Sequence, residues 1–255
     1  MSRRRGRSRP ASNFDLVYGR QPVLEVFRAG RRQVSRVILQ DSCEHSAELD
    51  SALAMAREAQ VTIEEGDRRR LDTLTDGANH QGIVAETGAY PYNVLDDRVG
   101  NGPSFWLLLD HIQDPQNLGS LLRSADAAGV TGVIIPSARA AGVTAAAVRA
   151  SAGAAEHVPV YRVSNICQAM RTLRDDGVSL YGLDVNKGSQ PYTSIDFTRP
   201  LGLAVGSEGQ GLSRVVRETC DGILHLPLLG SVASLNAAVA GAVALFEVVR
   251  QRGQG

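Results

Sequence analysis

A polar segment follows a strongly apolar run near the middle of the chain, and its residue types suit phosphate binding. "FWLLLD" leads into "HIQDPQNLGSLLRSADAAGV", which contains Asn117 and Arg123. Asp114-Pro115 should interrupt the strand, and we expect Asn117 to cap the following helix by accepting from a backbone N–H. Arg123 lies more than one helical turn further on. Together with the helix N-terminus these side chains could hold a phosphate, although a capped helix with a surface arginine is the structural alternative.

A second loop, "LAVGSEGQGLS", is rich in glycine. Gly206 and Gly211 have the spacing of a phosphate-binding P-loop, but Leu212 stands where the lysine is required. The dinucleotide fingerprint fails as well, because the order of the glycines is wrong. The pattern therefore predicts a tight turn that exposes backbone groups to a ligand, with Glu208 at its tip. An acid between glycines can also be a solvated turn residue, but its place at a strand end favours a role in a site.

The third stretch, "LPLLGSVASLNAAVAGAVALFEVVRQR", places Ser234 and Asn236 immediately before an apolar helix. Either residue could cap that helix, and capping explains one of the two but not both. The run from Ala237 to Phe246 is too short to span a membrane, which takes roughly 20 residues. Small residues in the helix predict that another backbone packs closely against it: Ala237, Ala238, Ala240, Gly241 and Ala244.

Short apolar runs separated by helical patterns position these three loops. After Ser104 the runs are "FWLLLD", "GVIIP", "HVPVYR", "VSLYGLD", "PLGLAVG" and "GILHLP". Such alternation predicts a parallel sheet covered by helices on both faces. Ligands of these sheets bind outside the carboxyl ends of the strands. We therefore expect the three loops to meet at one edge of the sheet.

The front of the chain indicates a separate, smaller α/β domain over residues 15–88. Helical patterns are "GRQPVLEVFRAG", stopped by Gly30, "AELDSALAMAREAQ" and "DRRRLDTLTD", and strand patterns are "RVILQ", "VTIEE" and "GIVAET". Residues 89–103 contain turn formers without sustained periodicity and are expected to be a linker. The larger domain then covers residues 104–255, which makes the whole chain α/β.

Composition limits the class of protein. Of 255 residues 43% are hydrophobic and 21% charged, as in globular proteins. There is no hydrophobic signal segment, and Cys43, Cys167 and Cys220 lack metal or redox spacing. We expect a cytoplasmic protein with structural thiols, no bound metal and no membrane association.

Positive charge is concentrated at the front of the chain, although the net charge is zero. Residues 1–14 form an arginine-rich arm that should be disordered. This arm could be attracted to nucleic-acid phosphates, or it could be a solvated tail or a targeting peptide. Further arginines are candidates for binding an RNA backbone, with solvated faces as the alternative: Arg31, Arg32, Arg36 and Arg68 to Arg70.

Taken together, the three loops resemble a known family. "DPQNLGSLLRSA", "VGSEGQGL" and "LPLLGSVASLNAAVA" look like the first, second and third motifs of the SpoU class of SPOUT RNA methyltransferases, in the same order. "VYGRQPVLEVFRAGRR" and "NHQGIVAE" are similar to the ribosomal-protein-like substrate domain of members that modify ribosomal RNA. The segment from Ala128 to Asn165 looks closest to bacterial enzymes that make 2′-O-methylguanosine in 23S ribosomal RNA.

The resemblance implies a deep trefoil knot in the C-terminal domain and a homodimer with its site at the subunit interface. It also implies that S-adenosylmethionine is held, largely by main-chain groups, at Gly206, Leu226 and Leu235. Ser207 departs from the family pattern, in which asparagine or alanine is frequent at this position. By position, the implied catalytic residues are Asn117, Arg123, Glu208, Ser234 and Asn236.

The implied activity is methylation of a ribose 2′-hydroxyl in RNA, with Arg123 acting by charge and orientation because a guanidinium stays protonated. Ser234 and Asn236 would shape the loop, and Glu208 would fix that arrangement. A guanosine of 23S ribosomal RNA is the expected target, because the transfer-RNA members generally lack the front domain. Three alternatives stay open: a resistance-type enzyme for another ribosomal site, a transfer-RNA enzyme, and an RNA-binding assembly factor without catalysis.

Overall fold

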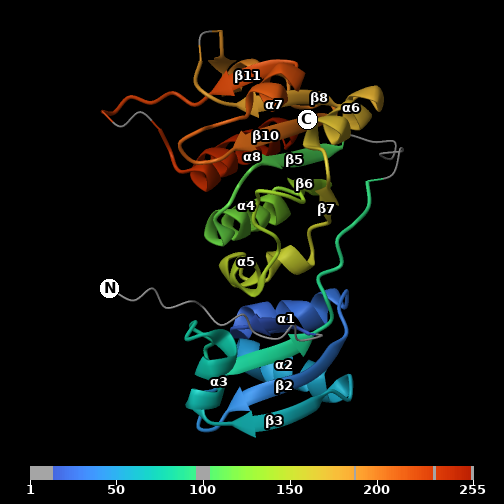
Figure 1. Ribbon diagram of the computed structural model, residues 1–255, viewed down its shortest axis with the longest axis vertical. Coiled ribbons are helices and arrows are strands. Elements are labelled where there is room, and N and C mark those ends of the chain that lie inside the picture. Colours follow the sequence, from blue (N-terminus) through green and yellow to red (C-terminus); the bar gives the residue numbers. More distant parts are fainter. Residues whose placement is uncertain (1–13, 96–103, 187, 232–233, 254–255) are drawn as a thin grey trace, which may run out of the picture. The chain divides into compact units, whose positions relative to one another are not determined.

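The computed structural model describes residues 14–95, 104–186, 188–231 and 234–253 (Figure 1). The chain divides into two compact units, residues 1–91 and 92–255. The expected arginine-rich arm lies outside the described residues except for Phe14, as does the part of the expected linker from 96 to 103.

The first unit is a four-stranded sheet with helices (Figure 1). Its strand order is β1-β4-β2-β3, in which β2 and β3 are parallel and β4 is antiparallel to both β1 and β2. Each predicted helix and strand is confirmed, and β1 is an addition that the sequence patterns did not predict. The elements are β1 (Asp15–Tyr18), α1 (Arg20–Ala29), β2 (Val34–Gln40), α2 (Ala47–Glu58), β3 (Thr62–Gly66), α3 (Arg68–Thr75) and β4 (Ile83–Thr87).

Helix α1 shows how local chemistry sets these boundaries. Its apolar face, which includes Val23, Leu24 and Val26, is buried. The helix ends where Gly30 adopts a left-handed conformation with φ of 61°, and the Gly30 N–H donates to the Val26 carbonyl. Glycine takes this conformation without steric cost, so the predicted stop is confirmed.

The second unit contains a seven-stranded sheet in the order β7-β6-β5-β10-β8-β11-β9, and all its pairings are parallel (Figure 1). The predicted parallel sheet is confirmed, and the two-residue strand β9 is an addition. Its strands are β5 (Phe105–Asp110), β6 (Gly132–Pro136), β7 (Val160–Val163), β8 (Ser179–Leu183), β9 (Gln190–Pro191), β10 (Leu201–Gly206) and β11 (Gly222–His225). Its α-helices are α4 (Pro115–Ala127), α5 (Ala145–Ala150), α6 (Ile166–Asp175), α7 (Arg214–Thr219) and α8 (Ala237–Arg252).

Helices cover both faces of this sheet. On one face, Trp106 and Leu108 of β5 belong to a buried apolar cluster with residues of α6 and α7, such as Met170 and Val216. On the other face, α8 packs against α4 and β10. Successive residues of a strand point to opposite faces of the sheet. Because both faces are covered by helices, the central strands are apolar on both sides.

Helix α8 packs tightly where its residues are small. A Cβ atom on Gly241 would lie 2.5 Å from Cδ2 of Leu121 on α4, so the two backbones approach as closely as the sequence predicted. On another side of α8, Val239, Val243 and Phe246 are exposed. Among the described helices, none combines the length and apolar character needed to cross a bilayer.

Candidate active site

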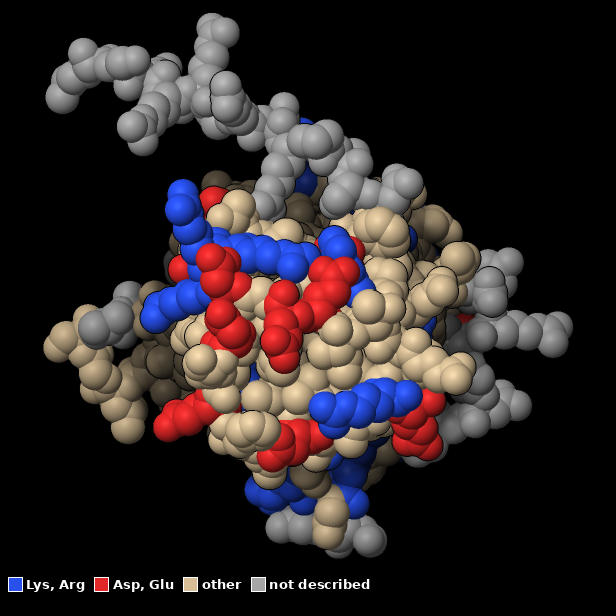
Figure 2. All heavy atoms as spheres, turned by 90° about the horizontal axis from the view of Figure 1, so that it is seen from below, with Lys and Arg blue, Asp and Glu red and all other residues tan. Residues whose placement is uncertain are grey.

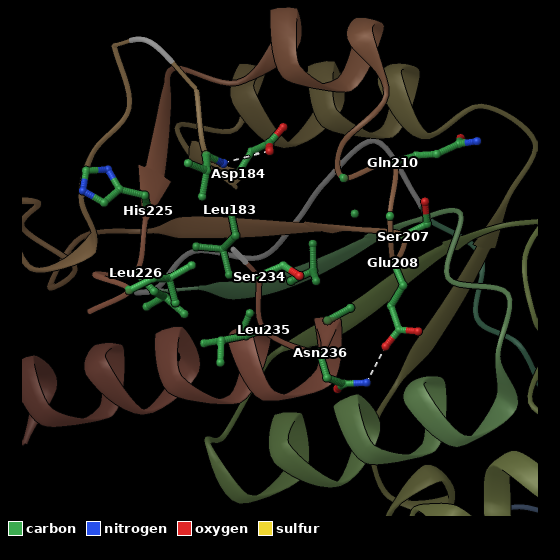
Figure 3. A pocket seen from close by; sticks show the side chains of 18 of the residues that line it. Leu183, Asp184, Ser207, Glu208, Gln210, His225, Leu226, Ser234, Leu235 and Asn236 are labelled. Atoms are coloured by element: carbon green, nitrogen blue, oxygen red, sulfur yellow. Dashed lines mark hydrogen bonds between the residues drawn. The ribbon is translucent and has the colours of Figure 1, made fainter. Parts of the chain in front are cut away.

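Asn236 is the N-cap of α8, and its side chain connects the three loops. Figure 3 shows its contact with Glu208. Its Oδ1 accepts from the N–H groups of Ala238 and Val239, at 2.9 and 3.2 Å. Its Nδ2 donates to Oδ1 of Asn117, at 2.9 Å, and to Oε1 of Glu208. With the oxygen committed to the backbone and both amide hydrogens donated, this carboxamide has one possible orientation.

Asn117 lies inside α4, so the prediction that it caps this helix is wrong. The N-cap is Asp114, whose Oδ1 accepts from the Gln116 N–H at 3.0 Å. Pro115 occupies the first helical position, where its fixed φ and missing N–H are tolerated, and this places Asp114 one residue before the helix. Asn117 is 8% exposed, and its Oδ1 accepts from Asn236.

The second loop is the tight turn that the glycines predicted. Ser207 and Gly211 exchange two backbone hydrogen bonds, at 3.1 and 2.9 Å, so the chain folds back on itself directly after β10. Gly209 and Gly211 have φ of 82° and 64°. A Cβ atom on Gly206 would lie 2.1 Å from the carbonyl carbon of Gly211, so no side chain fits there. Glu208 therefore projects from the tip of the turn towards Asn236 (Figure 3).

A cavity of about 580 Å³ opens at the carboxyl ends of β8, β10 and β11. Residues that sequence reasoning missed also line it, among them Leu183, Asp184 and His225 (Figure 3). They lie at or just after the ends of β8 and β11, so the strand-end rule applied to every strand would have found them. The expected site residues that line this cavity are Gly206, Glu208, Leu226, Ser234, Leu235 and Asn236.

Asp184 helps to hold the second loop in place. Its Oδ2 accepts from Nε and Nη2 of Arg217 on α7, at 3.0 and 2.5 Å. The same Nη2 also donates to the Leu212 carbonyl, at 3.1 Å. This pair thus connects the end of β8 to α7 and to the end of the second loop.

A second, polar cavity of about 510 Å³ shares Ser207, Glu208 and Gln210 with the first. Asn117 of α4 and the N-cap residue Asp114 also line it. Glu208 therefore borders both cavities. This arrangement provides space for two ligands that meet beside the turn.

Arg123 is not brought to these cavities within one chain. It is exposed on α4, lines neither cavity, and makes no hydrogen bond or ion pair with the described residues. The other four residues of the expected catalytic set border the two cavities.

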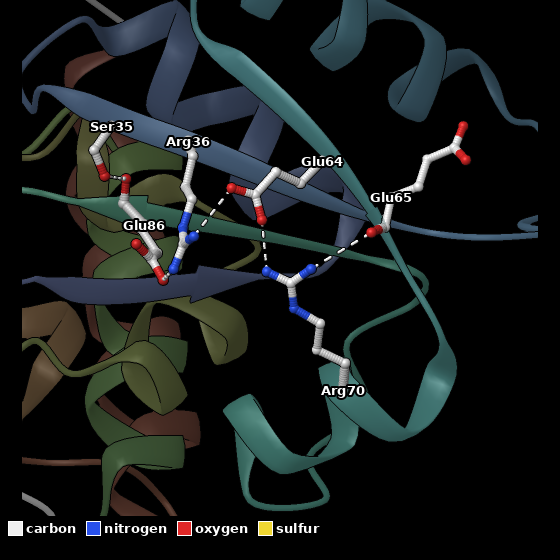
Figure 4. Close-up of polar contacts among 6 residues, drawn as sticks. All are labelled: Ser35, Arg36, Glu64, Glu65, Arg70 and Glu86. Atoms are coloured by element: carbon white, nitrogen blue, oxygen red, sulfur yellow. Dashed lines mark hydrogen bonds and ion pairs between the residues drawn. The ribbon is translucent and has the colours of Figure 1, made fainter.

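Several arginines proposed for RNA binding have internal roles in the first unit. Arg32 is buried, with its guanidinium 4.7 Å from the centre of the Tyr90 ring. Arg36 pairs with Glu64 at 3.0 Å and Glu86 at 2.7 Å (Figure 4). Hydrogen bonds to these two carboxylates, led by Glu86, raise the pKa of Arg36. Arg32 and Arg36 therefore have structural partners in the first unit, and contact with RNA stays a prediction for both.

Arg70 also has an acidic partner, because its Nη2 lies 2.5 Å from Oε2 of Glu64 (Figure 4). Basic and acidic side chains are interleaved on the face of the molecule shown in Figure 2. Paired charges of this kind cancel at long range, so this face does not act as a continuous basic patch. Among the described residues no group of three or more histidine, cysteine, aspartate or glutamate side chains is placed to hold a metal.

Comparison with known families gives two matches. Residues 104–246 match the SpoU rRNA Methylase family, and residues 16–93 match the family described as RNA 2′-O ribose methyltransferase substrate binding.

Individual relatives agree with these matches. The chain is 37% identical over 247 residues to Bacillus subtilis YacO, assigned to the TrmH family of tRNA/rRNA methyltransferases, covering 95% of this chain and 98% of that protein. It is 40% identical over 251 residues to a tRNA/rRNA methyltransferase of Mycobacterium avium, covering 96% and 81%. The solved structure of the SpoU methyltransferase AviRb from Streptomyces viridochromogenes has a TM-score of 0.80 at 30% identity, covering 95% of this chain and 91% of AviRb. AviRb in complex with AdoMet has a TM-score of 0.79. With both regions matched and similarity extending over nearly the whole chain, the protein belongs to the SpoU rRNA methylase family.

Proposed function

We propose that this protein transfers the methyl group of S-adenosylmethionine to a ribose 2′-hydroxyl of RNA. The observation that carries this proposal is the Asn236 carboxamide, which joins α4, the turn after β10 and α8 where two cavities meet. Two adjoining cavities suit a reaction with two substrates, a methyl donor and a nucleotide. The AdoMet complex of AviRb supports the identity of the donor.

The residues of the larger cavity fit S-adenosylmethionine. A volume of about 580 Å³ lies in the range of small-molecule sites. Leucine side chains offer an apolar surface to the adenine, whereas Asp184 and His225 offer polar groups. Without a side chain at Gly206, a ligand can approach the backbone closely. We propose that Gly206, Leu226 and Leu235 hold the donor, whose sulfonium supplies a methyl group activated for transfer.

The catalytic roles follow from positions. Asn236 fixes Asn117 and Glu208 relative to each other, and Ser234 shapes the rim of the donor cavity. Arg123, which makes no hydrogen bond or ion pair with the described residues, grips a phosphate of the target RNA and polarises the 2′-oxygen. A guanidinium provides planar, bidentate recognition of phosphate and keeps its charge.

We propose further that the protein is a homodimer in which Arg123 serves the site of the other subunit. Val239, Val243 and Phe246 of α8 form an exposed apolar stripe suited to burial between two copies. The deep trefoil knot implied by the family belongs to the same proposal, with α8 entering through the loops that surround the donor cavity.

A guanosine of 23S ribosomal RNA is the proposed target. The match over residues 16–93 supports an RNA-selecting front domain, for which we retain the bounds 15–88, followed by a linker over 89–103 and a catalytic domain over 104–255. The relatives are described as tRNA/rRNA methyltransferases, so a transfer-RNA target is the second candidate. Another ribosomal site and a non-catalytic assembly role remain alternative outcomes of the test.

The test uses purified protein with radiolabelled S-adenosylmethionine and, separately, total ribosomal RNA and total transfer RNA from cells that lack the gene. Digestion to nucleosides and mass spectrometry then identify the product. We expect 2′-O-methylguanosine in 23S RNA. Label in transfer RNA alone would support the second candidate, and a base-methylated nucleoside would contradict ribose chemistry. S-adenosylmethionine binding without transfer to either RNA would support the assembly factor.

A further inference from the structure

A histidine borders the proposed nucleotide cavity and is not used by the roles assigned above. His111 directly follows β5 and lines the polar cavity together with Asn117 and Glu208. Its side chain is 37% exposed, and its Nδ1 lies 2.5 Å from Oδ1 of Asp110. The backbone at His111 has φ of 59°, a left-handed conformation that is uncommon for residues other than glycine. This conformation places the ring next to both the cavity and Asp110.

Asp110 is held so that it orients the imidazole. Its side chain is 1% exposed, and its Oδ2 accepts from the Ser213 N–H at 2.6 Å. Oδ1 is then the acceptor for the His111 ring. An ionised carboxylate accepts only, so this geometry assigns a hydrogen to Nδ1, and in the neutral imidazole the lone pair is then on Nε2. Nε2 makes no hydrogen bond with the described residues, which leaves it available to a ligand.

Methylation of a hydroxyl releases a proton, and the other groups of this cavity are poor acceptors for it. Arg139 lines the cavity, but a guanidinium, like that of Arg123, does not lose its proton. Asp114 caps α4 through Oδ1, and Glu208 accepts from Asn236. Carboxylates are also weaker bases than imidazole at neutral pH. His111 is therefore the group of this cavity whose chemistry suits a general base.

We propose that His111 is a catalytic residue that accepts the proton of the target 2′-hydroxyl. This inference rests on the proposed function. In the step, the 2′-oxygen forms a bond to the methyl carbon, and the O–H proton moves to Nε2 of His111. The electron pair of the broken carbon–sulfur bond stays on sulfur, which leaves a neutral thioether. The imidazolium, stabilised by Asp110, then releases its proton to solvent.

The proposal predicts how the reaction depends on pH. A protonated imidazole cannot accept a second proton, so the rate of transfer should fall on the acid side. The charged groups that line the cavity around the ring are Asp114, Arg139 and Glu208, in addition to Asp110 behind it. The substitution that tests the proposal removes only the imidazole and leaves these four charged residues unchanged.

The test compares His111→Asn with the matched control His45→Asn. Asparagine tolerates left-handed backbone and can donate to Asp110, so the fold should be retained. His45 also pairs with an aspartate, Asp50 at 2.7 Å, but it is 80% exposed in the first unit. Single-turnover transfer to ribosomal RNA from cells lacking the gene is measured across pH. We expect H111N to lose about 10²- to 10⁴-fold in rate together with the acid limb of the profile, while H45N behaves as wild type. S-adenosylmethionine binding, measured by calorimetry, should be unchanged in both.

Chemical rescue separates a catalytic from a structural role. His111→Gly removes the ring and relieves the left-handed backbone, and added imidazole should restore transfer in proportion to its concentration. In ¹⁵N NMR spectra of the free protein, the His111 signal is identified by its absence in H111N. This signal should show the tautomer with the hydrogen on Nδ1. Near-normal turnover of H111N with an intact acid limb, or a protonated Nε2, would overturn the proposal. An inactive wild-type protein would instead overturn the proposed function and this inference with it.

Discussion

At Asn236 one carboxamide makes four hydrogen bonds, two as acceptor to the start of α8 and two as donor to the other loops. The sequence predicted that Ser234 or Asn236 caps this helix, and that capping explains only one of them. It did not reveal that the capping residue also joins the loops. The cap at Asp114 was missed because a proline can either end a strand or occupy the first position of a helix. Only the backbone shows that Pro115 begins α4 and that Asp114 is its N-cap.

Asn236→Asp tests the donated hydrogen bonds separately from the cap. Aspartate still accepts from the backbone of α8, but it cannot donate, and its charge repels Glu208. Because a hydrogen bond to a charged group contributes roughly 1.5–3 kcal/mol, we expect methyl transfer to fall at least about tenfold. Asn165→Asp, at the N-cap of α6, is the matched control and should keep wild-type turnover. Equal turnover of N236D and wild type would show that these bonds do not organise the site.

Arg123→Lys tests the geometry of the guanidinium and not its charge. Lysine keeps the positive charge but lacks the planar, bidentate fork, so transfer should fall about tenfold or more. Because Arg123 is exposed and makes no hydrogen bond or ion pair with the described residues, urea unfolding and S-adenosylmethionine binding should not change. Arg171→Lys on α6, also exposed, provides the control. Near-normal turnover of R123K would contradict the orienting role.

At the scale of elements, strands and helices were largely predictable because apolar periodicity and glycine stops are local. Carboxyl ends of parallel strands meet at one edge, so the loops after β5 and β10 could be assigned to one site in advance. Asp184 was missed because the segment after β8 was not among the three loops singled out, and His225 because it is the last residue of β11, directly before the third loop. The strands β1 and β9 are short and give little periodic signal.

Gly206→Ala tests the turn after β10. The added methyl group would clash with the backbone of Gly211, so the turn must open. We expect a loss of stability of about 1–3 kcal/mol and weaker S-adenosylmethionine binding in calorimetry. Gly88→Ala is the control, because a Cβ atom there meets only the Gln33 carbonyl oxygen, at 3.9 Å. Unchanged affinity in G206A would separate this turn from the donor site.

Helix α8 carries a pH-dependent ion pair. Hydrogen bonds from Arg250 lower the pKa of Glu247 to about 2, from its ordinary value of 4.5. Because the folded-state pKa is depressed, the stabilisation is present above about pH 4.5 and is lost as the pH falls towards 2. We expect Glu247→Gln to lower the free energy of unfolding by on the order of 1 to 2 kcal/mol at neutral pH. In urea titrations, the free energy of unfolding of this variant should depend less on pH between pH 5 and 2. Glu218→Gln, in the exposed pair with Arg214, is the control and should leave the pH dependence of the free energy of unfolding unchanged.

At the scale of the whole molecule, the sequence resemblance gave the family and the two-part organisation, whereas the assembly depends on surfaces that periodicity does not reveal. Gly241 of α8 lies against Leu121 of α4 in the same chain, and only the structure shows that Val239, Val243 and Phe246 are left exposed. In the same way, the sequence alone does not show that Arg32 is buried or that Arg36 pairs with acidic side chains, so both appeared as candidates for RNA binding.

Val243→Arg tests the proposed subunit interface. A charge on the exposed stripe of α8 resists burial between two copies, so analytical ultracentrifugation should show a monomer where the wild type is a dimer. The rate of methyl transfer should decrease as the dimer is lost, because Arg123 then has no site in a second subunit to serve. Val215→Arg is the control, since Val215 is 50% exposed on α7. A dimeric V243R, or a monomer with full activity, would contradict this assembly.

The most direct test of the account maps 2′-O-methylation across all ribosomal and transfer RNA in cells without the gene, complemented with wild type or N236D. The account predicts that one ribose mark, on a guanosine of 23S RNA, is lost with the gene, restored by the wild type, and not restored by N236D at equal protein level. Identical methylation maps with and without the gene would contradict the claim that these loops form a ribose methyltransferase site.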